Sequence, residues 1–189
     1  MDIIMNRDHD IIIREASAAD AHGIARVHVD AWCTTYTGIM PDSVLEALSY
    51  DEDEKKQKDM FKHPRPGSKT FVAEVEPDGI VGFASGGNAW HRGLRQRRSR
   101  IYKGELFLIY ILEACQRMGI GTMLVHRVIN HIKSLGLENM IIWVLEENSA
   151  CKFYEKLGGI RVDEKMTERG GKQLKEIAYS WDDIDSFRA

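Results

Sequence analysis

Hydrophobic residues follow two patterns along this chain. Short apolar runs rich in β-branched residues, bounded by glycine, proline or aspartate, predict β-strands, and apolar residues spaced three or four positions apart predict helices. The predicted strands are residues 11–16, 69–76, 79–90, 103–112, 139–147, 160–168 and 172–182. The predicted helices are residues 17–32, 42–50, 119–135 and 149–158, and a highly charged stretch, 51–62, follows the second of them.

The order of these elements predicts the fold class. Strand 103–112, helix 119–135 and strand 139–147 follow one another, and a helical crossover of this kind joins parallel strands. Hairpin signals at Pro77-Asp78-Gly79 and Gly170-Gly171 predict antiparallel pairs on both sides. We expect an α+β fold with a mixed, mostly antiparallel central sheet of about six to seven strands, a central parallel βαβ pair and about four helices. It forms a single domain, residues 1–189, with its core in about 11–182.

Composition narrows the class of protein. The chain has 189 residues and a formal net charge of −3, so its charge gives no reason to expect nucleic acid or a membrane as a partner. It contains no apolar run near the ~20 residues of a membrane span and no secretory signal at its start. Cys33, Cys115 and Cys151 are widely spaced, which predicts reduced thiols in a cytoplasmic protein and no metal site.

Two glycines mark the candidate site. Gly119 and Gly121 lie where strand 103–112 gives way to a helix, although glycine in a helix costs about 1 kcal/mol relative to alanine. The free N–H groups and the dipole of a helix start form an anion site, and glycine lets phosphate oxygens approach them. A tight strand-to-helix turn explains the spacing equally well. The dinucleotide fingerprint and the Walker loop both require residues that are absent here.

Three segments resemble the GNAT superfamily of N-acetyltransferases. Gln116-x-x-Gly119-x-Gly121 is similar to its coenzyme A loop, and "ENSACKFYEKLGG" (147–159) resembles its second coenzyme A segment. "VHVDAWCTTYTGIMP" (27–41) resembles a bacterial branch that carries Trp-x-x-Thr-Tyr-x-Gly near the N-terminus. With the order of strands, the resemblance covers about nine-tenths of the chain.

The resemblance implies acetyl-CoA as the cosubstrate. Strands 103–112 and 139–146 are expected to separate, with the pantetheine arm against the backbone of the first strand and the diphosphate on amides of the glycine loop. One backbone N–H of that strand would bind the thioester carbonyl. The implied binding residues are Ile109, Tyr110, Ile111, Gln116, Arg117, Met118, Gly119, Ile120, Gly121, Thr122 and Asn148. The spacing from Asn148 to Tyr154 is one residue shorter than usual, which weakens the case for Asn148.

The resemblance also implies catalytic roles. Tyr154, in Phe153-Tyr154-Glu155, matches the tyrosine that acts as an acid toward the coenzyme A sulfur; the alternative is a core tyrosine. Glu105 lies eleven residues before Gln116, as does the base of histone-acetyltransferase-like members.

On a regular strand, Glu105 shares a face with Phe107, Ile109 and Ile111. Its Cα is then about 13 Å from that of Ile109, so we expect it to act through water. An exposed acid at the start of a strand is an equal alternative. Glu146 and Glu147 are weaker candidates for the base.

The acceptor site is the least specified part. The resemblance places Trp32, Thr35 and Tyr36 beside the acceptor, although tryptophan and tyrosine are commonly core residues. His28 and His91 are interpreted as surface or capping histidines. The stretch Arg92–Arg100 holds five arginines and is interpreted first as a solvated loop. A second interpretation is that it recruits an acidic acceptor or the cofactor's 3′-phosphate.

These features predict an acetyl-CoA-dependent N-acetyltransferase that works by direct transfer in a ternary complex. Its acceptor is a primary amine of a small molecule, peptide or protein. The alternative is a non-catalytic acyl-CoA-binding sensor or regulatory module on the same fold. The resemblance leaves a homodimer open, because dimers are common among these relatives.

Overall fold

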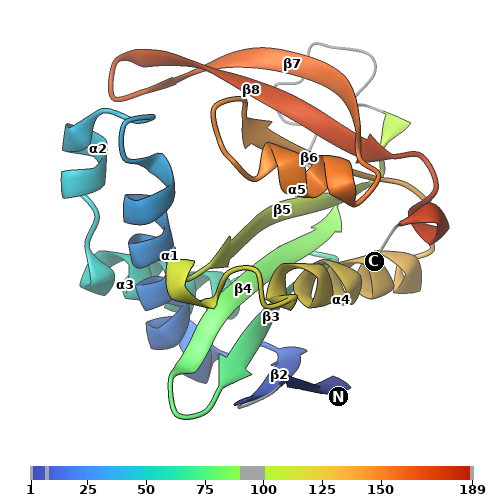
Figure 1. Ribbon diagram of the computed structural model, residues 1–189, viewed down its shortest axis with the longest axis horizontal. Helices are drawn as coiled ribbons and strands as arrows, with labels where there is room; N and C mark the ends of the chain where they lie inside the picture. Colours follow the sequence, from blue (N-terminus) through green and yellow to red (C-terminus); the bar gives the residue numbers. More distant parts are fainter. Residues whose placement is uncertain (1, 7–8, 90–100, 188–189) are drawn as a thin grey trace.

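A computed structural model describes residues 2–6, 9–89 and 101–187. Within these ranges one sheet contains eight strands, in the order β1-β2-β3-β4-β5-β6-β8-β7 (Figure 1). Neighbouring strands are antiparallel except β5 and β6, which are parallel. The strands are β1 (Asp2–Asn6), β2 (His9–Glu15), β3 (Ser68–Val75), β4 (Gly79–Asn88), β5 (Gly104–Ile111), β6 (Met140–Leu145), β7 (Ile160–Arg169) and β8 (Lys172–Trp181). The α+β class and the mixed, mostly antiparallel sheet are confirmed.

The described residues contain five α-helices rather than about four. They are α1 (Ala21–Tyr36), α2 (Asp42–Glu46), α3 (Tyr50–Lys62), α4 (Ile120–Ser134) and α5 (Cys151–Lys156). The additional helix is α3, which begins after the N-cap Ser49 and covers the charged stretch. The extra strand is β1, which precedes the predicted core. Among the described helices, none is both long enough and apolar enough to cross a membrane.

Helices cover both faces of the sheet. On one face, Ile24 and Val27 of α1 pack against Val72, Ile80 and Phe83 of β3 and β4. On the other face, α4 and α5 pack on the largest hydrophobic core. Figure 1 shows α1, α2 and α3 grouped at one side of the molecule, with α4 crossing in front of the sheet. The three cysteines are unpaired.

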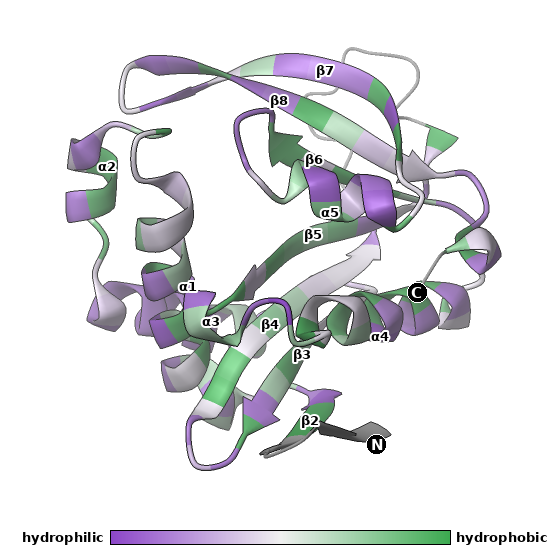
Figure 2. Cartoon of the chain, viewed as in Figure 1, coloured by the Kyte–Doolittle hydropathy of each residue, from purple (hydrophilic) through white to green (hydrophobic). Residues whose placement is uncertain are grey.

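The sheet opens between β5 and β6. These strands pair only at Gly104–Met140 and Glu105–Ile141, after which β5 keeps only β4 as a neighbour and β6 only β8. The expected separation of the two strands is therefore confirmed. The near-continuous apolar run 103–112 is typical of a strand buried on both faces, but from Phe107 onward the residues of β5 are only half-buried because the neighbouring strand has moved away. Figure 2 shows that β5 is nevertheless hydrophobic along its length.

A β-bulge changes which face the β5 side chains occupy. Gly86 pairs with Leu106 and Ser85 with Leu108, so Phe107 has no counterpart on β4. An extra residue in one strand shifts the alternation of its side chains. Glu105 and Phe107 consequently line a pocket on the α3 side, whereas Ile109 and Ile111 pack on the α4 side. The prediction that all four share one face is wrong.

Candidate active site

The segment that enters α4 leaves its backbone amides without partners. The first hydrogen bond of the helix runs from the N–H of Met123 to the carbonyl of Gly119, 3.1 Å away. Within the described chain, no backbone or side-chain group accepts a hydrogen bond from the N–H groups of residues 117–122. The first turn of α4 carries no acidic residue and no side-chain cap. Six free donors at the positive end of a helix dipole form a site for an anion.

The structure favours glycine at positions 119 and 121 for different reasons. Gly119 has φ +84°, a left-handed conformation that favours glycine, and its Cβ position faces open space. A Cβ on Gly121 would lie 3.1 Å from Cζ of Phe153, so this glycine lets α4 pack closely against α5. The tight-turn interpretation therefore holds for the local geometry. The same turn also exposes the amides, so the two interpretations are compatible.

Tyr154 lies in the core beside the open strands. Its residue is 3% exposed, and its ring packs against those of Phe153 and Tyr179 at centroid distances of 5.4 and 6.0 Å. Its hydroxyl has no hydrogen-bond partner among the described residues, yet it is not one of the buried unpartnered atoms, so the hydroxyl retains accessible surface. Burial raises the pKa of Tyr154 well above its usual value. The phenol is therefore protonated at neutral pH and can donate.

Trp32 and Tyr36 join a polar-aromatic group that bridges β5 and β6. Their rings are 5.1 Å apart, and Tyr36 packs with Leu145 at the end of β6. Burial raises the pKa of Tyr36, while the nearby Tyr110 hydroxyl and Asn148 side chain oppose that shift. The structure thus brings together residues from segments 27–41, 103–112 and 147–159.

Thr35 and Asn148, two further residues predicted for the site, lie at the margin of the group formed by Trp32, Tyr36 and Tyr110. Thr35 is half-buried on α1, and no described hydrogen bond joins its side chain to this group. Asn148 Oδ1 accepts the N–H of Ala150 at 2.8 Å, which stabilises the entry to α5. Because this oxygen already has a local partner, its role in shaping the loop before α5 is sufficient to explain an asparagine at position 148.

The indole of Trp32 carries an unsatisfied donor. Its Nε1 is buried and makes no hydrogen bond of acceptable geometry in the described chain. It lies near enough to the Tyr110 hydroxyl to oppose the large rise that burial causes in the pKa of Tyr110. A buried donor without a full hydrogen bond is costly, and such sites are common where a ligand supplies the acceptor.

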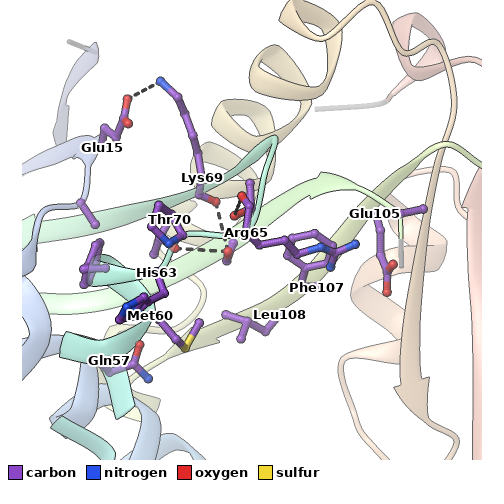
Figure 3. A pocket seen from close by; sticks show the side chains of 16 residues that line it. Glu15, Gln57, Met60, His63, Arg65, Lys69, Thr70, Glu105, Phe107 and Leu108 are labelled. Atoms are coloured by element: carbon purple, nitrogen blue, oxygen red, sulfur yellow. Dashed lines mark hydrogen bonds and ion pairs between the residues drawn. The ribbon is translucent and has the colours of Figure 1, made fainter. Parts of the chain in front are cut away.

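Glu105 lies at one end of a pocket of about 1200 Å³ beneath α3. Glu15, at the other end, binds Lys69 at 2.6 Å, and the Arg65 guanidinium lies 4.5 Å above the centre of the Phe107 ring (Figure 3). The alternative base Glu146 pairs with Arg161 at 3.0 Å and with Lys175 at 3.4 Å, away from this pocket. Glu147 is exposed.

His28 lies elsewhere than predicted. Its side chain is only 19% exposed, and its Nδ1 is 3.0 Å from Oδ1 of the buried Asp53 on α3. The prediction of a surface or capping histidine is therefore wrong. The charged stretch 51–62 could not single out Asp53, because its many acids alternate with lysines and only the docking of α3 on α1 buries this one. His91 and Arg92–Arg100 lie outside the described residues.

Comparison with known proteins identifies the family. A family model described as "Acetyltransferase (GNAT) family" matches residues 29–159, which is well over half of the chain. This chain belongs to the GNAT family of acetyltransferases. The GNAT match contains the separated strands, the segment 116–122 and Tyr154. The comparisons do not test the Trp-x-x-Thr-Tyr-x-Gly branch, which stays a prediction.

Two kinds of relatives agree with this family. A protein named as the uncharacterized N-acetyltransferase YuaI of Bacillus subtilis (strain 168) is 36% identical over 178 residues, which cover 94% of this chain and 96% of that protein. An N-acetyltransferase structure from Staphylococcus aureus Mu50 has a TM-score of 0.68 at 21% identity, covering 92% and 98% of the two chains. The PaiA N-acetyltransferase of Thermoplasma acidophilum, solved in complex with coenzyme A, has a TM-score of 0.64 at 18% identity, covering 88% and 97%.

Proposed function

We propose that this GNAT protein transfers the acetyl group of acetyl-CoA to a primary amine by direct attack in a ternary complex. The observation that carries the proposal is the combination of a sheet that opens after Glu105–Ile141 and six unpaired amides beside the opening. An opened sheet supplies an unpaired edge of β5 for an extended chain. The free amides supply an anion site where that chain would end in a diphosphate.

The chain's own geometry fits acetyl-CoA. The N–H groups of residues 117–122 would hold the diphosphate, and the open space at the Cβ position of Gly119 gives phosphate oxygens access to them. The edge of β5 at Ile109–Ile111, where β6 has left and Gln116 Nε2 donates to the Ile111 carbonyl at 3.3 Å, would pair with the pantetheine arm and offer one N–H to the thioester carbonyl. Gln116 and Asn148 would contribute contacts at the two ends of this path.

Transfer to an amine requires proton movements at both reacting atoms. A lysine-like amine has a pKa of about 10.4, so exposing its lone pair at neutral pH costs roughly 4–5 kcal/mol without a base. Glu105 is the predicted base and would act through water. Tyr154 would donate to the departing sulfur, and since burial raises its pKa, it acts chiefly as a hydrogen-bond donor to the developing thiolate.

The acceptor would approach from the α1 side of β5. Trp32, Thr35 and Tyr36 are the predicted lining residues, and the buried N–H of Trp32 could bind a carbonyl or hydroxyl of the acceptor. The pocket that contains Glu105 lies under α3 and includes Phe107 and Leu108 of β5. A primary amine on a small molecule or on a peptide fits this approach.

A thiol-release assay with purified protein tests the proposal. We expect acetyl-CoA to yield free coenzyme A only when an amine from a mixed panel is present, and the intact protein to carry no acetyl group without one. Binding of acetyl-CoA with no release for any amine would contradict the enzyme and support the sensor. An acetylated protein before amine addition would contradict direct transfer.

Tyr154→Phe tests the role at the sulfur. We expect at least about a 100-fold fall in turnover, the lower end of the usual range for losing a proton-donating group, with acetyl-CoA affinity nearly unchanged. Tyr179→Phe is the matched control, since Tyr179 packs on the same ring but donates to Glu155 at 2.7 Å. Unchanged turnover in Tyr154→Phe across the pH range would remove Tyr154 from the mechanism.

A further inference from the structure

Helices α1 and α3 are joined by two histidine–carboxylate pairs that differ in burial. His22 Nδ1 lies 2.7 Å from Oε2 of Glu54, with 78% of the histidine side chain exposed. His28 Nδ1 lies 3.0 Å from Oδ1 of Asp53, where the side chains are 19% and 10% exposed. A surface pair contributes little to stability, and a buried carboxylate needs several hydrogen bonds to remain charged. Holding α1 and α3 together therefore does not by itself explain why the His28–Asp53 pair is buried.

Asp53 is held as a carboxylate. Burial alone would raise its pKa, but hydrogen bonds from His28 and Gln57 and the nearby charge of Lys56 lower it. Gln57 Nε2 donates to the second oxygen at 3.2 Å. A carboxylate only accepts hydrogen bonds, so Nδ1 of His28 must carry the proton. In the neutral ring, the lone pair then belongs to Nε2.

The ring of His28 packs among aromatic side chains, and its other nitrogen, Nε2, keeps accessible surface. The ring packs at centroid distances of 5.3 Å from Trp32, 5.2 Å from Tyr110 and 6.3 Å from Phe83. Nε2 has no hydrogen-bond partner among the described residues and is not one of their buried unpartnered atoms. It is a basic nitrogen with a fixed tautomer and accessible surface. Two of the three rings around it belong to residues of the predicted acceptor and thioester sites.

We propose that His28, oriented by Asp53, is the group that takes the proton from the acceptor amine. This inference rests on the proposed acetyl transfer and deepens it. The ring contacts that of Tyr110, on the part of β5 that β6 has left, whereas the Cα of Glu105 lies five residues earlier on the strand, about 16 Å away. The histidine is therefore nearer to the reacting carbonyl than the predicted base is.

The proton and electron balance is complete without a further reactant. An acceptor ammonium loses one proton to Nε2 of His28, giving a neutral amine and an imidazolium that faces the Asp53 carboxylate. The amine lone pair forms the C–N bond at the thioester carbonyl, and the C–S bond breaks with its electron pair on sulfur. The second amine proton ends on that sulfur, with Tyr154 as hydrogen-bond donor. The imidazolium returns its proton to water.

Few ionisable groups surround His28. From α3 it faces Asp53, from β5 it faces Tyr110, and the neighbouring residues on α1 and β4 are Trp32 and Phe83, which do not titrate. Burial keeps Tyr110 protonated by raising its pKa. Among these described neighbours, Asp53 is therefore the charged group that faces the ring.

The test is the pH dependence of kcat/KM with the best amine from the thiol-release panel. We expect His28→Gln to lower kcat/KM by about 100-fold near neutral pH, and the deficit to shrink as pH approaches the pKa of the amine. Asp53→Asn removes the carboxylate that orients the ring, so we expect a fall of at least about tenfold. His22→Gln, which breaks the exposed pair on the same helices, should leave the profile unchanged.

Acetyl-CoA affinity and thermal unfolding of each variant separate a catalytic loss from misfolding. If the wild-type protein transfers acetyl and both His28→Gln and Asp53→Asn keep its pH profile and rate, the inference is overturned and the proposed function stands. If the wild-type protein releases no thiol with any amine, the proposed function itself falls. A parallel Glu105→Gln variant that loses the basic limb while His28→Gln keeps it would return the role to Glu105.

Discussion

The helices α3 and α4 begin in opposite ways. The N-terminus of α3 is completed by the protein: Ser49 accepts a hydrogen bond from the N–H of Glu52, and three acidic residues occupy the first turn. The N-terminus of α4 follows the N-cap Gly119 with no side-chain cap and no acid in its first turn, and the six N–H groups of residues 117–122 have no partner in the described part of the chain. Both ends present the same dipole, so the difference lies in what balances it. At α4 no described residue supplies the balancing charge, and the diphosphate of the proposed cosubstrate would supply it.

The same contrast appears between the two sides of β5. Its edge toward β4 is paired over most of its length, and its edge toward β6 is paired at only two positions. Unpaired backbone and half-buried apolar side chains are normally avoided in a stable fold. Both features occur in β5 next to the uncapped start of α4, which indicates a ligand that pairs with the backbone and covers the apolar side chains. Three substitutions test whether the start of α4 belongs to this binding site.

Thr122→Asp gives α4 the acid that α3 has, and is expected to have the largest effect. A carboxylate in the first turn should stabilise the free protein by about 0.5 kcal/mol through the helix dipole. The same charge repels the diphosphate, and at about 4 Å an interaction of several kcal/mol is expected, so coenzyme A affinity should fall by about 100-fold. Thermal unfolding and calorimetry measure the two effects. Thr122→Asn is the uncharged control and should bind normally; equal affinity of the two variants would contradict an anion site here.

Gly119→Ala tests the access that the glycine provides. Its φ of +84° strains any other residue, and a Cβ would occupy the open space before the amides. Gly136, at the other end of the same helix, has φ +74° and an equally open Cβ position. Both alanine variants should lose about 1–2 kcal/mol of stability, but only Gly119→Ala should lose coenzyme A affinity, by about tenfold. Parallel loss in both would show that strain alone is responsible.

Ser49→Ala has the smallest expected effect. Removing the cap of α3 should lower the free energy of unfolding by about 0.5–1 kcal/mol, because one N–H of the first turn loses its acceptor. Coenzyme A affinity should not change. A measurable loss of coenzyme A affinity would mean that the start of α3 also influences binding. The start of α4 would then not differ from that of α3 in the way described above.

Most of the fold is readable from the sequence because each element carries its own pattern. The apolar run 103–112, the stripe of helix 119–135 and the hairpin signal at residues 77–79 all predict elements that the structure contains. The glycine spacing also indicates the entry to α4. What could not be read depends on contacts between elements. The bulge at Phe107, which moves Glu105 to the α3 face, follows from pairing with β4.

The candidate base shows the same limit. His28 and Asp53 are 25 residues apart, on helices whose relative placement the sequence does not show. Asp53 stands among acids and lysines that look alike in the sequence. Only the packing of α3 on α1 distinguishes it from Glu54, its half-buried neighbour, whose partner His22 is exposed. The pairing of His28 with Asp53 therefore could not be predicted from residue type and spacing.

The most direct test of the central claim compares two ligands by calorimetry on the wild-type protein. Coenzyme A and pantetheine share the arm that would pair with β5, but only coenzyme A carries the diphosphate that the amides of residues 117–122 would hold. We predict that coenzyme A binds at least about 100-fold more tightly, a difference of about 2.7 kcal/mol. Equal affinity for the two ligands, or no heat with either at several temperatures, would contradict the claim.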